Sequence, residues 1–133
     1  MTDNELIQIT KLKVKAEKKL TAEIISYLEE INNRRLYVEY KCDSLFKFCV
    51  RILKYSQGEA SLRVKAVRVA KRLPEIKDKL ETSKVSLSSL ATLESFLTNN
   101  PKKNPKEMLD LIEGKSARET QNIFKHSRSK SKT

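Results

Sequence analysis

Residues 44–73 have the sequence SLFKFCVRILKYSQGEASLRVKAVRVAKRL, which predicts two helices joined by a tight turn. The first half carries apolar residues at helical spacing, and the segment YSQG then interrupts this spacing with residue types suited to a turn. Ser56 and Glu59 have the spacing of a capping box, in which the serine and glutamate side chains satisfy unpaired backbone N–H groups at a helix start. A second helix is therefore predicted over residues 58–73.

This second helix is predicted to have one apolar side and one cationic side. At 100° per residue, its apolar side chains share one arc, and polar and basic side chains form a neighbouring stripe. The arc consists of Leu62, Ala66, Val69, Ala70 and Leu73, and the stripe consists of Ser61, Lys65, Arg68 and Arg72. A short helix, a tight turn and a second helix of this kind form the outline of a helix-turn-helix unit, whose second helix enters the DNA major groove.

The predicted DNA contacts include this stripe and its neighbours. They are Gln57, Ser61, Arg63, Lys65, Arg68, Lys71 and Arg72, with further contacts from Arg128, Lys130 and Lys132 near the C-terminus. Most of these side chains are expected to neutralise phosphates, and an arginine near the N-terminal half of the helix is expected to contact a guanine edge. Lysine and arginine are also ordinary surface residues, so a merely solvated helix face is the alternative interpretation.

Length and composition favour one helical domain. The chain has 133 residues, 38% of them hydrophobic, which is enough for one domain with a core and too few for two domains of ordinary size. Two glycines and three prolines leave little turn chemistry, which favours long helices over many short strands. The predicted fold class is all-α, a compact domain over residues 1–126 with about six helices, including a long N-terminal helix and the central helix-turn-helix-like pair.

The net charge of the chain indicates which kind of partner it attracts. The sequence contains 28 lysines and arginines and 17 aspartates and glutamates, which gives a formal net charge of +11. Such a charge attracts polyanions, nucleic acid first and anionic membranes second.

The N-terminal helix is predicted to run from the cap formed by Thr2 and Glu5 to about Asn33, because apolar residues recur every three or four positions between them. The lysines of its first half are either a solvated face or phosphate contacts; they are Lys11, Lys13, Lys15, Lys18 and Lys19. A helix this long in a small domain is also a candidate homodimer interface. Residues 36–40, LYVEY, alternate like a strand but have no partner strand, so an extended connection is predicted.

Capping residues mark the remaining helices and the end of the domain. Further helices are predicted over residues 74–84, 87–97, 105–113 and 117–124, with caps at Ser86, Asn104 and Ser116. Residues 127–133, SRSKSKT, carry no apolar side chain that could be buried. They are predicted to form a disordered basic tail.

Cysteine and hydropathy patterns indicate the cellular setting. Cys42 and Cys49 form no CxxC pair and have no histidine nearby, so a zinc site would lack ligands, and Cys49 is expected to be a small buried apolar residue. No window is apolar enough to span a bilayer, and the polar N-terminus lacks the apolar core of a signal peptide. We expect a soluble cytoplasmic protein, associated with the bacterial nucleoid if it is bound to DNA.

Several blocks of the sequence, in order, carry a family resemblance. They are residues 25–56, ISYLEEINNRRLYVEYKCDSLFKFCVRILKYS; the spaced Ala60, Arg63, Val64, Ala66 and Arg68; residues 73–76, LPEI; and residues 114–116, GKS, with Arg118 and Glu119. Together they resemble the helical N-terminal region of bacterial HNH endonuclease-like proteins, over about residues 5–125. Residues 44–97 also resemble the helix-turn-helix core of ParB-type partition proteins. Both resemblances imply an all-helical, DNA-directed module.

The resemblance does not extend to a catalytic centre. In HNH nucleases, two histidines and an asparagine hold a divalent ion that activates water. His126 is the only histidine of this sequence, and it adjoins the predicted tail. No GxxxxGK[ST] loop is present, and no histidine stands near a serine or cysteine within a segment predicted to fold, since Ser127 beside His126 belongs to the predicted tail. We predict no enzyme activity, no catalytic or metal-binding residues, no cofactor and no small-molecule substrate.

Two functions are compatible with these patterns. The leading prediction is a stand-alone, non-catalytic protein that binds double-stranded DNA and does not bind membranes. The alternative is a protein-interaction module, or an accessory module of a nuclease whose catalytic domain is missing or supplied by a partner. Val64 and Val67 lie outside the main apolar arc of the second helix, and their exposure would favour the alternative.

Overall fold

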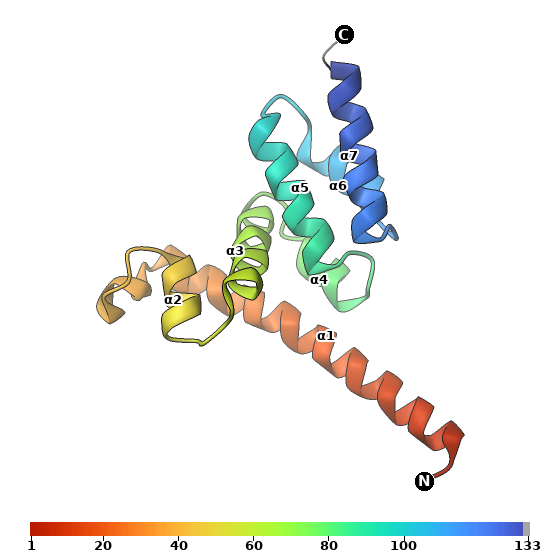
Figure 1. The fold of residues 1–133 in the computed structure, drawn as a ribbon. Helices are drawn as coiled ribbons and strands as arrows, with labels where there is room; N and C mark the ends of the chain where they lie inside the picture. Colours follow the sequence, from red (N-terminus) through yellow and green to blue (C-terminus); the bar gives the residue numbers. More distant parts are fainter. Residues whose placement is uncertain (132–133) are drawn as a thin grey trace.

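The computed structural model describes the backbone of residues 1–131 and the side chains of residues 1–125, and within this part the chain is all-helical (Figure 1). The elements are α1 (Asp3–Asn33), the 3-10 helix η1 (Leu36–Tyr40), α2 (Leu45–Arg51), α3 (Gln57–Arg72), α4 (Ile76–Glu81), α5 (Leu87–Asn99), α6 (Pro105–Ile112) and α7 (Ala117–Ser131). The predicted all-α class, the long N-terminal helix and the central pair α2 and α3 are confirmed. Residues 1–131 contain seven α-helices where about six were predicted.

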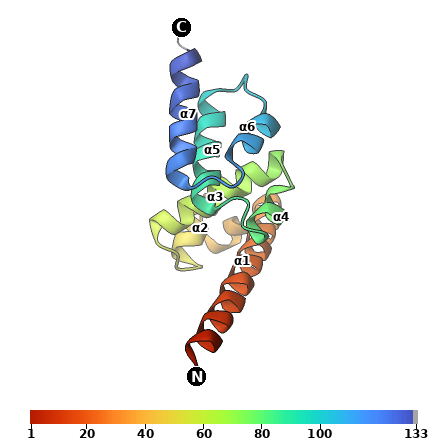
Figure 2. The same cartoon turned by 90° about the vertical axis from the view of Figure 1, so that its right-hand side faces the viewer.

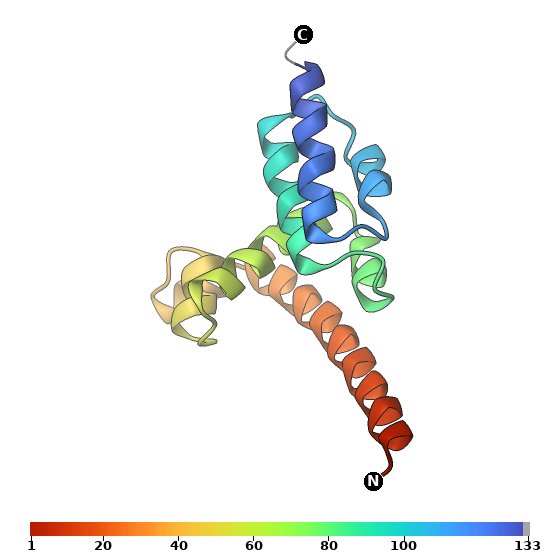
Figure 3. The ribbon, with the colours of Figure 1, turned by 45° about the vertical axis from the view of Figure 1, so that its right-hand side comes forward.

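The helix α3 occupies the centre of the molecule. It packs along α5 and also contacts α1, α2 and α4. In Figure 1, α1 crosses below the other helices, while α5, α6 and α7 stand together above α3. Figures 2 and 3 show the N-terminal half of α1 extending away from these helices. Residues 1–17 are accordingly all exposed.

Local capping explains where the helices begin. The side-chain oxygens of Thr2, Ser44, Ser56, Ser86, Asn104 and Ser116 each accept a hydrogen bond from the backbone N–H three residues further on. These bonds satisfy donors that lack a partner within the first turn. At Ser56 the capping box is complete, because the Ser56 N–H also donates to Glu59 Oε1 at 3.0 Å. The predicted capped helix starts are therefore confirmed, whereas the helix predicted over residues 74–84 is shorter and runs from Ile76 to Glu81 without a side-chain cap.

One apolar core joins the helices. Fully buried side chains come from elements far apart in the sequence; they include Ile25, Leu28, Val69, Leu90, Leu93, Leu109 and Ile112. Each contributes about 1.5–3 kcal/mol relative to an exposed position. The rings of Phe96 and Phe124 stack with their centroids 4.3 Å apart, and this contact fastens α7 to α5.

The extended connection predicted for residues 36–40 is wrong, because this segment forms η1. Arg35 and Lys41, on either side of it, both have left-handed backbone conformations, with φ of 53° and 61°. Tyr37 packs against the core, and the ring of Tyr40 makes an edge contact with Phe48 at a centroid distance of 5.5 Å. Alternation alone predicted extended backbone, but a single turn of 3-10 helix also brings Tyr37 onto the core.

The prediction that Val64 and Val67 offer spare apolar surface is also wrong. Both side chains are buried, with exposed fractions of 9% and 4%. The reason is the central position of α3, which has neighbours on two flanks and therefore buries a wider arc than a helix lying on a surface. Leu62, assigned to the apolar arc, is only half-buried.

The C-terminal residues differ from the sequence-based prediction in one respect. A disordered tail was predicted from residue 127, whereas the helical backbone of α7 continues to Ser131. Lysine and arginine are good helix formers, and their charge is favourable near a helix C-terminus. The side chains of residues 126–133 and the backbone of residues 132–133 lie outside the described part of the chain, and so do the predicted contacts of Arg128, Lys130 and Lys132.

Candidate nucleic-acid interface

An open strip runs along α3 between its two packed flanks. The buried residues of the helix are Ala60, Val64, Ala66, Val67, Val69 and Ala70. The four residues of the predicted stripe, Ser61, Lys65, Arg68 and Arg72, are each half-buried or exposed. At 100° per residue they lie within an arc of about 60°, opposite the centre of the buried arc. We call these four residues the α3 strip.

The three cations of the α3 strip differ in their surroundings. Arg68 is exposed, and neither Arg68 nor Lys65 forms an ion pair within the described residues. Arg72 Nη1 lies 3.9 Å from Oε2 of Glu94, a carboxylate that is buried beneath it. Lys65 and Arg68 are therefore available to an external anion, whereas Arg72 is partly engaged by α5.

The side chain of Lys65 borders a hollow between α3, α5 and α7. This hollow has a volume of about 360 Å³, and its lining includes the polar side chains of Ser88, Thr92, Ser95 and Gln121. Hydroxyl and amide groups bind phosphate oxygens as readily as they bind water. The hollow therefore extends the α3 strip with neutral hydrogen-bonding groups.

The other three predicted contact residues on this helix lie outside the strip. Arg63 donates a hydrogen bond to the Glu59 carbonyl at 3.0 Å, and its guanidinium lies 4.4 Å from the ring centroid of Tyr55. Gln57 is exposed in the first turn of α3, beside the strip, and Lys71 is exposed about 60° beyond Arg68 around the helix. The strip thus contains four of the seven residues predicted on this helix.

A larger cleft lies beyond Arg63 and contains cations that the sequence did not single out as one group. Its volume is about 700 Å³, and it is bordered by Lys18, Arg63, Lys84 and Lys115, with Glu17 as the one carboxylate in its lining. It shares Ser88 and Ala117 with the hollow beside Lys65. The capped N-termini of α5 and α7 both border this cleft. We call it the cationic cleft.

The cleft is held together by contacts between distant loops. The Gly114 N–H donates to the Lys84 carbonyl at 2.8 Å, which joins the loop after α6 to the loop before α5. Gly114 has a φ of +74°, a conformation that glycine adopts without strain at a helix end. Lys18 Nζ donates to Ser83 Oγ at 2.5 Å and fixes α1 to the same loop. Lys18 and Arg63 had been considered from the sequence as DNA contacts, whereas Lys84 and Lys115 had not, because they come from short separate segments.

The cysteines and carboxylates show no arrangement suited to metal binding. Burial raises the pKa of the Cys49 thiol, so this group stays protonated at neutral pH. The described residues contain no group of three or more histidine, cysteine, aspartate or glutamate side chains that could hold a metal ion. No helix in this part of the chain has the length and apolar character needed to cross a membrane.

Comparisons with known proteins leave the family open. No protein-family model matches the sequence, and neither the comparison with curated proteins nor the comparison with solved structures gave a match. The fold and the site define an all-helical protein with a cationic strip on its central helix. The resemblances to HNH endonuclease-like and ParB-type proteins stay predictions.

Proposed function

We propose that this protein binds double-stranded DNA through the α3 strip, without cleaving it. The observation that carries the proposal is that the α3 strip holds three cations on one face of the central helix, of which Lys65 and Arg68 have no carboxylate partner within the described residues. The core packing of α3 fixes their spacing before any ligand arrives. A net charge of +11 adds long-range attraction to a polyanion.

The packing around α3 favours contacts to phosphates over contacts to base edges. A helix that enters the major groove must project beyond its neighbours for its side chains to reach base edges. Here α5 runs along one flank of α3, and α1 and α2 contact the helix as well. We therefore assign Lys65, Arg68 and Arg72 to phosphates, and the predicted contact between an arginine and a guanine edge is not part of the proposal. Binding of this kind depends weakly on sequence and strongly on salt.

A salt titration with matched variants tests the proposal. If five or six phosphates are engaged, the logarithm of affinity should fall against the logarithm of salt concentration with a slope of about −5. Lys65→Ala/Arg68→Ala should flatten that slope by about two units, because each cation accounts for about 0.9. Fluorescence anisotropy with a labelled duplex measures both slopes.

The control removes equal charge from elsewhere. Arg51 and Lys102 are exposed and lie outside the strip and the cleft, so Arg51→Ala/Lys102→Ala should leave the slope close to that of the wild type. If the control variant loses as much affinity as the strip variant, net charge alone is responsible and the α3 strip is not the site.

A protein-binding role is the second candidate, and one observation favours it. Large apolar side chains of α1 are exposed, among them Leu6, Leu20 and Tyr27 with exposed fractions of 54%, 56% and 70%. Exposed apolar rows on a helix are typical of a surface that another helix covers. Measuring the mass of the protein in solution without DNA tests this role, and a homodimer through α1 is the form that we propose.

A further inference from the structure

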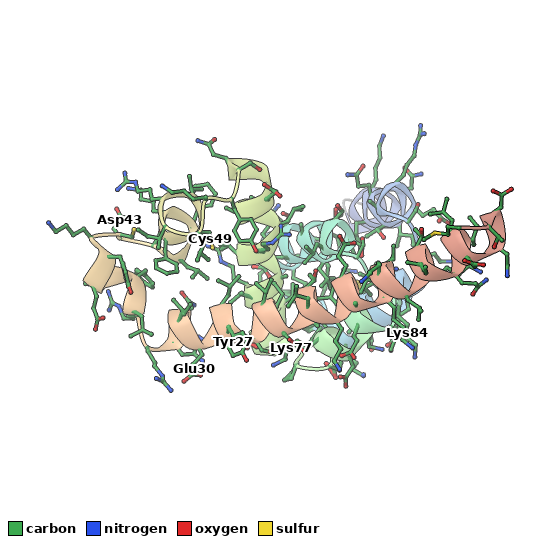
Figure 4. All side chains as sticks on the ribbon, turned by 90° about the horizontal axis from the view of Figure 1, so that it is seen from below. Tyr27, Glu30, Asp43, Cys49, Lys77 and Lys84 are labelled. Atoms are coloured by element: carbon green, nitrogen blue, oxygen red, sulfur yellow. The ribbon has the colours of Figure 1, made fainter. Side chains whose placement is uncertain are left out.

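The helix α1 has two apolar sides, and only one of them is buried in the core. Ala22, Ile25 and Leu28 point into the core and are buried. The opposite side carries Leu6, Ile9, Ala16, Leu20 and Tyr27, all of them exposed. Figure 4, a view from below, shows α1 crossing the near side of the molecule with Tyr27 at its outer surface. No part of the described chain covers this outward row.

The outward row follows a seven-residue repeat. Its members are separated by three, seven, four and seven positions, which are the intervals between a and d positions of a coiled coil. In that repeat, Leu6, Lys13, Leu20 and Tyr27 occupy the a positions, and Ile9, Ala16, Glu23 and Glu30 occupy the d positions. The row therefore has the spacing that a second helix requires, with Lys13 and Glu23 as its central charges.

The charges decide the direction of a paired helix. In a parallel pair, each residue meets its own copy, so Lys13 would meet Lys13 and Glu23 would meet Glu23. In an antiparallel pair centred on residue 18, Lys13 meets Glu23 of the second copy twice, once on each side of the centre. The same register places Ala16 against Leu20 and Ile9 against Tyr27. Neither Lys13 nor Glu23 forms an ion pair within the described part of its own chain.

We propose that two copies of this chain pair antiparallel along the outward row of α1, with Lys13 of each copy facing Glu23 of the other. The contact runs from Leu6 to Glu30, a length of about 36 Å at 1.5 Å per residue. At its two ends, Leu6 meets the aliphatic stem of Glu30. This inference deepens the protein-binding role proposed for α1, and it is independent of DNA binding because it uses none of the residues of the α3 strip.

Sedimentation equilibrium without DNA tests the pairing. The wild type should be a dimer, and Leu20→Glu should be a monomer, because the substitution places a charge in a central layer. Leu111 on α6 is also exposed, at 45%, so Leu111→Glu is the matched control and should stay dimeric. Circular dichroism checks that the helix content of each variant equals that of the wild type.

A charge exchange tests the direction. Lys13→Glu should weaken the dimer about tenfold, because it turns two exposed attractions into repulsions. Lys13→Glu/Glu23→Lys should restore the affinity, since opposite charges face each other again. In a parallel pair, like charges would meet in all of these proteins, and the exchange would rescue nothing.

Disulfide trapping tests the register without relying on affinity. Under oxidation, a mixture of Ala16→Cys and Leu20→Cys proteins should form a mixed disulfide dimer, and neither variant alone should crosslink efficiently. Wild-type protein is the control for Cys42 and Cys49, which are both buried. Crosslinking of Ala16→Cys with itself would show a parallel pair and overturn the proposal.

Two further outcomes would overturn the proposal. One is a wild-type protein that stays monomeric at ~0.1 mM, together with no mixed disulfide between the Ala16→Cys and Leu20→Cys proteins. The other is a monomer whose outward row binds anionic lipid vesicles, with Leu20→Glu abolishing the binding. The Lys65→Ala/Arg68→Ala substitutions should change DNA binding but not the dimer mass, the charge exchange or the disulfide trapping. The proposals for DNA binding and for pairing along α1 can therefore fail separately.

Discussion

Single residues at the helix starts combine structural and electrostatic roles. Glu59 closes the capping box of α3, and Glu119 does the same at α7, where the Ser116 N–H donates to its Oε1 at 3.0 Å. The backbone N–H of each partner serine holds the pKa of the glutamate below its ordinary value of 4.5. Both carboxylates are therefore favoured in their charged form, which also suits the positive end of the helix dipole.

The lowered pKa values of Glu59 and Glu119 predict a loss of stability in acid. A carboxylate whose pKa is lower in the folded state than in the unfolded state stabilises the fold above the unfolded pKa, here about 4.5. That contribution is lost as the pH falls through the folded pKa. Between pH 7 and pH 3, the melting temperature of Glu59→Gln/Glu119→Gln should fall less than that of the wild type, since glutamine keeps the capping bond but does not titrate.

Exposed carboxylates outside these caps provide the control. Glu39 and Glu81 are exposed and take part in no capping box, so Glu39→Gln/Glu81→Gln should show the acid loss of the wild type. Identical acid profiles for all three proteins would mean that the two capping carboxylates do not govern stability in acid.

At the scale of elements, α3 and the end of α7 offer cations in different ways. The α3 strip lies on a helix whose position the core holds on two flanks. Residues 127–133 follow Phe124, whose ring stacks on Phe96 of α5. Cations that are already ordered lose less conformational freedom on binding than cations on a chain end.

Deleting residues 127–133 should therefore weaken DNA binding without abolishing it. The deletion removes Arg128, Lys130 and Lys132, so part of the nonspecific attraction is lost while the α3 strip remains. Titration of the truncated protein with duplexes of different sequence should show lower affinity and unchanged relative preference. A truncated protein that no longer binds, beside a Lys65→Ala/Arg68→Ala protein that binds normally, would assign the function to the tail.

At the scale of the whole molecule, the chemistry of the chain predicts binding without catalysis. HNH nucleases use two histidines and an asparagine around a divalent ion, whereas this sequence has only His126. The purified protein should not nick supercoiled plasmid in magnesium, manganese, nickel or zinc. Agarose gel electrophoresis measures this, and nicking that co-purifies with the protein and disappears in His126→Ala would contradict the prediction.

The parts of the site that sequence reasoning identified are those that one helix supplies. Lys65, Arg68 and Arg72 recur at helical spacing, so a projection of α3 alone places them on one face. The cationic cleft was not predicted, because Lys84 and Lys115 lie in loops that are distant in sequence and that the folded chain joins, for example through the bond between Gly114 and Lys84. Two capped helix starts, at Ser86 and Ser116, were visible in the sequence, but their proximity was not.

The all-α class and the capped helix starts could be predicted from the amino-acid sequence, because capping bonds and apolar spacing act within a few residues. Which apolar surfaces are covered depends instead on how the helices pack. This packing buries Val64 and Val67 by giving α3 neighbours on two flanks, and it covers one apolar side of α1 while leaving the row from Leu6 to Tyr27 open. The physical reason is that burial depends on which distant segments come together, and helical periodicity in one segment contains no information about its neighbours.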